Sequence, residues 1–129
     1  LALEISEKIK EIECIRLSIL RDYAISEISR NFPTATINGS TLDRLPNNIN
    51  FCFPGLDTEF AIISLDVYGI SASYSSSCRT LKEDSSSYVV DSLGKKDCSY
   101  SSLRVSLGRD SSEDDIDKLV TALQKIVVQ

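Results

Sequence analysis

Residues 47–53 read Asn-Asn-Ile-Asn-Phe-Cys-Phe and carry the clearest structural signal in the chain. Ile49, Phe51 and Phe53 fall on every second position, while Asn48, Asn50 and Cys52 occupy the positions between them. Successive side chains of an extended strand point to opposite faces. The stretch therefore predicts a strand with one buried face, which the following Pro-Gly pair ends.

A second stretch, residues 102–107, repeats this alternation. Leu103, Val105 and Leu107 are expected to point inward, and Ser102, Arg104 and Ser106 to lie on the opposite face. Short strands are also expected at 34–37 and 70–73. Together these patterns predict a small, mainly antiparallel sheet.

Helical patterns surround the expected strands. The first thirty residues predict one long amphipathic helix, whose apolar positions recur every three or four residues: Ile5, Ile9, Ile12, Ile15, Ile19 and Tyr23. Residues 57–68 predict a helix with Phe60, Ile63 and Val67 on one side. Residues 88–93 predict a short helix that follows possible serine N-caps.

The last helix is expected to begin after residues 112–115, Ser-Glu-Asp-Asp, which form a variant of the capping box. We interpret this acidic run as a helix cap rather than a metal site. The apolar stripe that follows contains Ile116, Leu119, Val120, Leu123 and Val127. Apolar stripes of the first and last helices are core or domain-docking surface. Residues 1–129 are thus predicted to form a single α+β domain, with helices packed on one face of the sheet.

Composition narrows the classes of function. The chain has 129 residues and a net charge of −5, with both charge signs interspersed, which argues against nucleic acid as a partner. No apolar run approaches about 20 residues, so no membrane span is expected. Because the chain opens with Leu1 rather than Met, we expect a processed product or a piece of a longer protein.

The four cysteines are Cys14, Cys52, Cys78 and Cys98, and none belongs to a CxxC pair. With no histidine, the chain offers neither a zinc site of the Cys/His type nor a Ser-His-Asp or Cys-His catalytic group of its own. We expect a reduced protein of cytoplasmic type. Two disulfides are the alternative.

Residues 74–87 are dense in serine and carry both charge signs, which predicts a mobile loop. Cys78 lies in this loop beside Arg79. A mobile loop would let the thiol travel, and the neighbouring cation favours the thiolate, so Cys78 is a candidate nucleophile. The alternative is an incidental surface cysteine.

Four sequence blocks follow one another along the chain. The first is Asn-Gly at 38–39, followed by RLPNNIN at 44–50 and FPGLDTE at 53–59. The others are GISASYSSSC at 69–78, SYVVDSLG at 87–94 and SLRVSLGR at 102–109. Together these blocks resemble the C-terminal part of the cysteine desulfurases, the NifS/IscS group of class-V aminotransferase-like pyridoxal-phosphate enzymes.

The resemblance implies that the chain is the small domain of a fold-type I pyridoxal-phosphate enzyme and lacks the large domain with the cofactor lysine. It implies that Cys78 is catalytic: it takes sulfur from L-cysteine as a persulfide, and L-alanine leaves. Arg104 matches the arginine that binds the substrate carboxylate. The full-length enzyme would be a homodimer that supplies an acceptor or scaffold protein for iron–sulfur cluster or thio-cofactor assembly.

By itself the chain is then expected to be inactive and to bind no pyridoxal phosphate. A different class of function is the alternative: a sulfur-relay or interaction module that keeps the small-domain fold without catalysis. Asn38 is interpreted as a turn residue, and the two asparagines of the Leu-Pro-Asn-Asn run, Asn47 and Asn48, as partners of backbone groups rather than of substrate. Cys14, Cys52 and Cys98 are assigned no chemistry.

Overall fold

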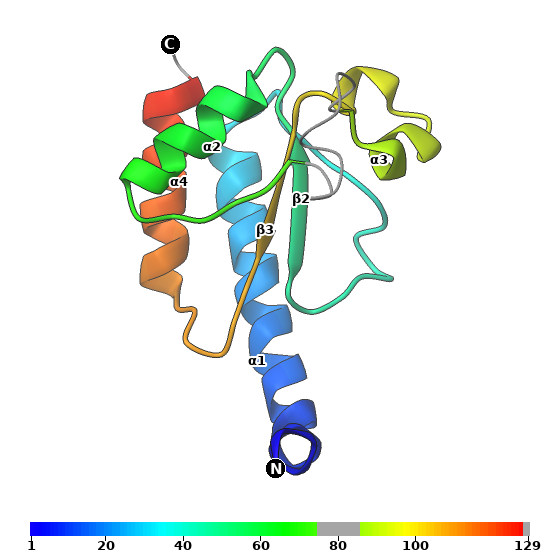
Figure 1. Ribbon diagram of the computed structural model, residues 1–129, viewed down its shortest axis with the longest axis vertical. Coiled ribbons are helices and arrows are strands. Elements are labelled where there is room, and N and C mark those ends of the chain that lie inside the picture. The colour runs from blue at the N-terminus through cyan, green and yellow to red at the C-terminus, as the bar shows by residue number, and fades with distance from the viewer. Residues whose placement is uncertain (75–85, 128–129) are drawn as a thin grey trace.

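The computed structural model describes residues 1–74 and 86–127. A three-stranded antiparallel sheet lies at its centre, in the order β1 (Thr36–Ile37), β2 (Asn48–Cys52) and β3 (Ser102–Ser106). Figure 1 shows α1, α2 and α4 on one side of this sheet and the short α3 on the other. The α+β class, the antiparallel pairing and the packing of the main helices on one face are confirmed.

The alternation read from residues 47–53 sets which face of β2 is covered. Ile49, Phe51 and Phe53 are buried in the core against the helices, as expected. The strand expected at 70–73 forms only at Ser73, which makes an isolated antiparallel bridge to Arg104. Ile70 still belongs to the end of the preceding helix, because its N–H donates to Leu65 O at 3.0 Å.

Helix α4 (Glu113–Val127) follows the expected pattern most closely. Its predicted stripe is buried except for Val127, which is partly buried. At its start, the Asp115 carboxylate accepts from Ser112 N at 3.1 Å and from Ser112 Oγ at 2.8 Å. These hydrogen bonds, with help from Lys118, hold the pKa of Asp115 below its usual value. The capping prediction is confirmed.

Helix α1 (Ala2–Asn31) has the expected length, but the predicted stripe is not core. Ile12, Ile15 and Ile19 are 71%, 64% and 63% exposed. The buried positions are instead Leu20, Ala24 and Ile28, all in the C-terminal half. The N-terminal half projects beyond the sheet, so it has no neighbouring element to pack against among the described residues (Figure 1). Of the two readings of this stripe, a docking surface remains.

Helix α2 (Thr58–Val67) begins at Asp57, whose side chain accepts from Phe60 N at 3.0 Å. Phe60, Ile63 and Val67 share one side of the helix, as expected, but this side faces away from the core: they are 52%, 67% and 80% exposed. The face that meets the core is formed by Thr58, Ala61 and Leu65. Both faces carry apolar residues, so periodicity alone could not choose between them. Small Ala61, fully buried, lets the helix approach the core closely.

On the other side of the sheet lie α3 (Tyr88–Ser92), capped by Ser87, and the 3-10 helix η2 (Lys96–Cys98). A disulfide joins Cys98 at the end of η2 to Cys52 at the end of β2, with the two Cα atoms 5.3 Å apart. This distance is normal for a disulfide. The expectation of a fully reduced protein is therefore wrong for this pair, because the fold brings together two cysteines that are 46 residues apart in sequence.

Two further observations bear on the class of protein. None of the helices in the described parts of the chain is long and apolar enough to cross a membrane. Within residues 1–74 and 86–127, no three cysteine, aspartate or glutamate side chains gather into a group that could hold a metal ion.

Candidate functional site

Arg104 lies in the middle of β3 with its side chain exposed on the polar face of the sheet. Asn50 is its direct partner on β2. On the other edge, Ser73 N donates to Arg104 O at 3.0 Å, and Arg104 N donates to Ser73 O at 2.6 Å. Because both backbone groups of Arg104 point to Ser73, Arg104 and Asn50 form a non-hydrogen-bonded pair, in which side chains lie closest.

Arg104 has no carboxylate of its own in the described parts of the chain, where all ion pairs involve other residues. A guanidinium presents five donors in a planar fork that matches a carboxylate. The open face beside Asn50 is thus chemically suited to binding an anionic group of that shape.

A buried polar network lies beside this pair. Asn38 is 3% exposed, and its Nδ2 donates to Asn50 Oδ1 at 2.9 Å and to Ser102 Oγ at 2.8 Å. Ser102 Oγ donates in turn to Cys98 O at 2.6 Å. Asn38 is more than a turn residue, because its side chain joins β2, β3 and η2. Sequence reasoning missed this role, since an Asn-Gly pair is read first as a turn.

Two asparagines in and next to β2, Asn50 and Asn47, have different roles. Asn47 O accepts from Leu107 N at 2.9 Å, which extends the pairing of the two strands. The side chain of Asn50 binds that of Asn38 and not a backbone group.

The two ends of the serine-rich segment are fixed on this polar side of the sheet. At the first end, Ser73 is bonded to Arg104. At the second, Ser87 N donates to Ser99 O at 2.9 Å, one residue after Cys98. Cys78, Arg79 and most of the loop expected at 74–87 lie outside the described residues. The structure does place the segment's first end beside Arg104.

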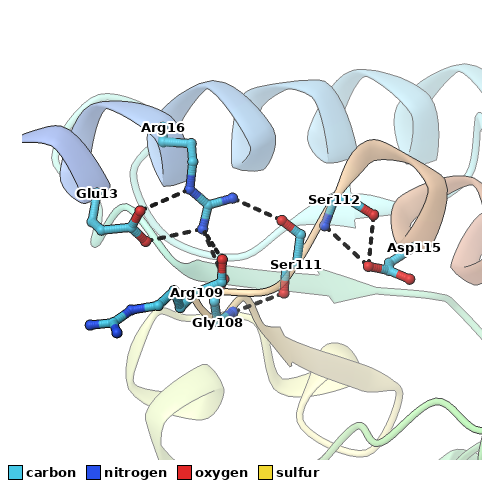
Figure 2. A network of polar contacts seen from close by, with 7 residues as sticks. All are labelled: Glu13, Arg16, Gly108, Arg109, Ser111, Ser112 and Asp115. Atoms are coloured by element: carbon cyan, nitrogen blue, oxygen red, sulfur yellow. Dashed lines mark hydrogen bonds and ion pairs between the residues drawn. The ribbon is translucent and has the colours of Figure 1, made fainter.

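A second network holds the turn that follows β3 (Figure 2). Arg16 of α1 donates through Nη1 to Ser111 O at 2.8 Å, and through Nη2 to Gly108 O at 3.1 Å and Arg109 O at 2.8 Å. Glu13 binds the same guanidinium from the other side, at 3.1 and 3.0 Å. The hydrogen bond lowers the pKa of Glu13 and raises that of Arg16.

The Arg16 network therefore fixes the β3–α4 turn onto the long helix. Its contacts with the turn could not be read from local sequence, because the carbonyl groups that accept from Arg16 there are more than ninety residues away.

A groove of about 530 Å³ opens between residues 68–71 and residues 105–111, and α4 also lines it. A second groove, of about 440 Å³, lies between Tyr68 and α4. Arg104 lines neither of them. In the part of the chain that the structure describes, Arg104 thus lies on an open face, and enclosing a ligand there requires a further surface.

Known structures share this fold. The NifS-like protein of Rickettsia africae ESF-5 superposes with a TM-score of 0.74 and 23% identity, over 90% of this chain and 29% of that one. A second structure, described as a NifS-like protein, gives a TM-score of 0.81 and 21% identity, over 98% and 31%. No family model matches the chain. The fold is that of a part of the NifS-like proteins.

Comparison of sequences identifies relatives at higher identity than these structures. The cysteine desulfurase IscS of Clostridium botulinum is 37% identical over 99% of this chain, and that of Dictyoglomus turgidum is 33% identical over 97%. The chain is homologous to the C-terminal part of these cysteine desulfurases, as the sequence blocks indicated. It spans about a third of their length, 33% and 31% respectively.

Proposed function

We propose that the chain is the small domain of a pyridoxal-phosphate-dependent cysteine desulfurase. In this role it binds the carboxylate of L-cysteine and receives the substrate's sulfur. The observation that carries the proposal is the bridge between Ser73 and Arg104, because it sets the start of the segment that bears Cys78 beside the exposed guanidinium.

Arg104 is the proposed substrate-binding residue. Its guanidinium accepts a carboxylate in a bidentate manner, and the charge-assisted bonds are roughly twice as strong as neutral ones. Arg104 lies on a strand that pairs on both edges, so its backbone is ordered before substrate binds. Little conformational entropy of the backbone is then lost on binding.

Cys78 is the proposed sulfur acceptor. The thiol takes the sulfur atom of L-cysteine, so that one cysteine thiol and L-cysteine become one persulfide and L-alanine. Cys78 follows Ser73 by five residues, a stretch that spans at most about 18 Å. That reach is compatible with a thiol that meets the substrate near Arg104 and then delivers sulfur to an acceptor protein.

In this proposal the chain does not bind pyridoxal phosphate by itself. Several of the described lysines are engaged elsewhere: Lys95 Nζ donates to Ile37 O at 2.7 Å, Lys118 pairs with Asp115, and Lys125 stands over the ring of Tyr68. The cofactor and its lysine would come from a large domain. The exposed stripe of α1, with Ile12, Ile15 and Ile19, is the surface on which we place that domain.

The remaining parts of the proposal follow from the family. The full-length enzyme is a homodimer of the cytoplasm that passes its sulfur to a scaffold or acceptor protein for iron–sulfur cluster or thio-cofactor assembly. The 129-residue chain alone is inactive, because it lacks the cofactor lysine.

The test is production of L-alanine and of protein persulfide by the full-length protein that carries this chain. Cys78→Ala should abolish persulfide formation, whereas Cys14→Ala, at the exposed cysteine of α1, should leave it unchanged. Arg104→Ala should raise KM for L-cysteine. Full persulfide formation by the Cys78 variant would end the acceptor role.

A second function, that of a sulfur-relay module without catalysis, is favoured by the fact that the chain has a core of its own. The reading frame upstream of Leu1 separates the two. A cofactor domain encoded there supports the enzyme, and a start codon just before Leu1 supports the relay module.

A further inference from the structure

Asn50 occupies a place that the proposed function of Arg104 does not explain. The two residues face each other across β2 and β3 and share the polar face of the sheet. In a non-hydrogen-bonded pair the Cβ atoms are about 4.5–5.5 Å apart, so one ligand can reach both side chains. An anion bound by Arg104 is thus within reach of the Asn50 side chain.

The hydrogen bonds of the buried network decide which end of the Asn50 amide is offered. The single hydroxyl hydrogen of Ser102 goes to Cys98 O, so Ser102 Oγ accepts from Asn38. This fixes the amide nitrogen of Asn38, which also donates to Asn50. Asn50 must then present its oxygen to Asn38, and its own Nδ2 is turned away.

That nitrogen is not sealed in the core. In the described parts of the chain, the buried side-chain nitrogen and oxygen atoms without a partner are Asn38 Oδ1 and Arg44 Nη1. Asn50 itself is half-buried, and none of its described contacts uses Nδ2. The amide thus presents an oriented donor on the open face of the sheet.

We propose that Asn50 is a second binding residue for the substrate carboxylate, with Asn38 as its positioning residue. Arg104 supplies the charge and the fork, and Asn50 Nδ2 donates a further hydrogen bond to one carboxylate oxygen, which has lone pairs for both. The inference rests on the proposed function, since it concerns the ligand that Arg104 holds.

The closing experiment uses steady-state kinetics of the full-length protein with L-cysteine. Asn50→Ala should raise KM about tenfold or more, the usual loss for a hydrogen bond to a charged group. Asn50→Asp keeps the acceptor for Asn38 but replaces the donor by a second negative charge, and it should raise KM further. Asn48→Asp is the matched control, because Asn48 lies on the same strand opposite Ser106 and not opposite Arg104. It should change KM less than twofold.

A carboxylate-free analogue, 2-aminoethanethiol, separates binding from damage to the fold. Its inhibition constant should be unchanged by Asn50→Ala. If Asn50→Ala weakens binding of the analogue as much as that of L-cysteine, Asn50 has a structural role and the inference is overturned. If Arg104→Ala raises KM but Asn50→Ala does not, the inference fails and the proposed function stands. If Arg104→Ala has no effect on KM, the proposed role of Arg104 fails first.

Discussion

The disulfide between Cys52 and Cys98 gives the most direct quantitative prediction. It closes a loop between cysteines that are 46 residues apart. In the chain-entropy account, a cross-link of this span reduces the conformational entropy of the unfolded chain and so raises its free energy by about 4 kcal/mol relative to the open chain. Reduction should therefore cost the 129-residue chain about that much free energy of unfolding.

The assay is urea unfolding followed by circular dichroism, with and without a dithiol reductant. A Cys14→Ser, Cys78→Ser background leaves the disulfide pair as the only cysteines. Both the reduced protein and a Cys98→Ala variant should unfold at a lower urea concentration than the disulfide-bonded protein, and by a similar amount. Their free energy of unfolding should fall more steeply with urea concentration than that of the disulfide-bonded protein, because the open unfolded chain exposes more surface.

Two results would refute this reasoning. A loss below about 1 kcal/mol would mean that the cross-link does not constrain the unfolded chain as its span requires. Two reactive thiols in the folded Cys14→Ser, Cys78→Ser protein before any reductant is added would mean that Cys52 and Cys98 are not joined.

The remaining predictions concern single side chains. Leu65→Ala should cost about 2–5 kcal/mol of unfolding free energy, and Ile63→Ala on the exposed face of the same helix about 0.5 kcal/mol or less; equal losses in urea unfolding would contradict the observed orientation of α2. The hydrogen bond from Tyr23 to Asp117, at 2.8 Å, raises the pKa of Tyr23 to about 12. Because the pKa of Tyr23 in the folded protein lies above the ordinary value near 10, this hydrogen bond should contribute fully to the free energy of unfolding below about pH 10. The contribution should be lost as the pH rises towards 12. Asp117→Asn should lower the pKa of Tyr23 measured by ultraviolet titration. An unchanged pKa would show that the hydrogen bond to Asp117 does not cause the shift. Arg16→Ala should speed amide hydrogen exchange in residues 108–112 and leave exchange in β2 unchanged, whereas uniform acceleration would show a global effect.

The candidate site was only partly readable from the sequence. Arg104 and Cys78 were identified from motifs, and the alternation in 102–107 correctly placed Arg104 on the polar face. The pairing of Arg104 with Asn50 and the burial of Asn38 could not be predicted. They depend on which strand lies beside which, and on a register that joins residues more than fifty positions apart.

By itself the sequence determined the strands around residues 49–53 and 103–107, the cap and apolar stripe of α4, and the likeness to the cysteine desulfurases. These features are set by local periodicity and by contiguous motifs, so neighbouring residues contain the information. Only the tertiary structure decided which faces of α1 and α2 meet the core and that Cys52 bonds to Cys98. It also decided that the Asn38 amide binds the side chain of Asn50, the residue paired with Arg104. Each of these depends on contacts between elements far apart in the chain, and a helix with apolar residues on more than one face buries the one that its neighbours can reach.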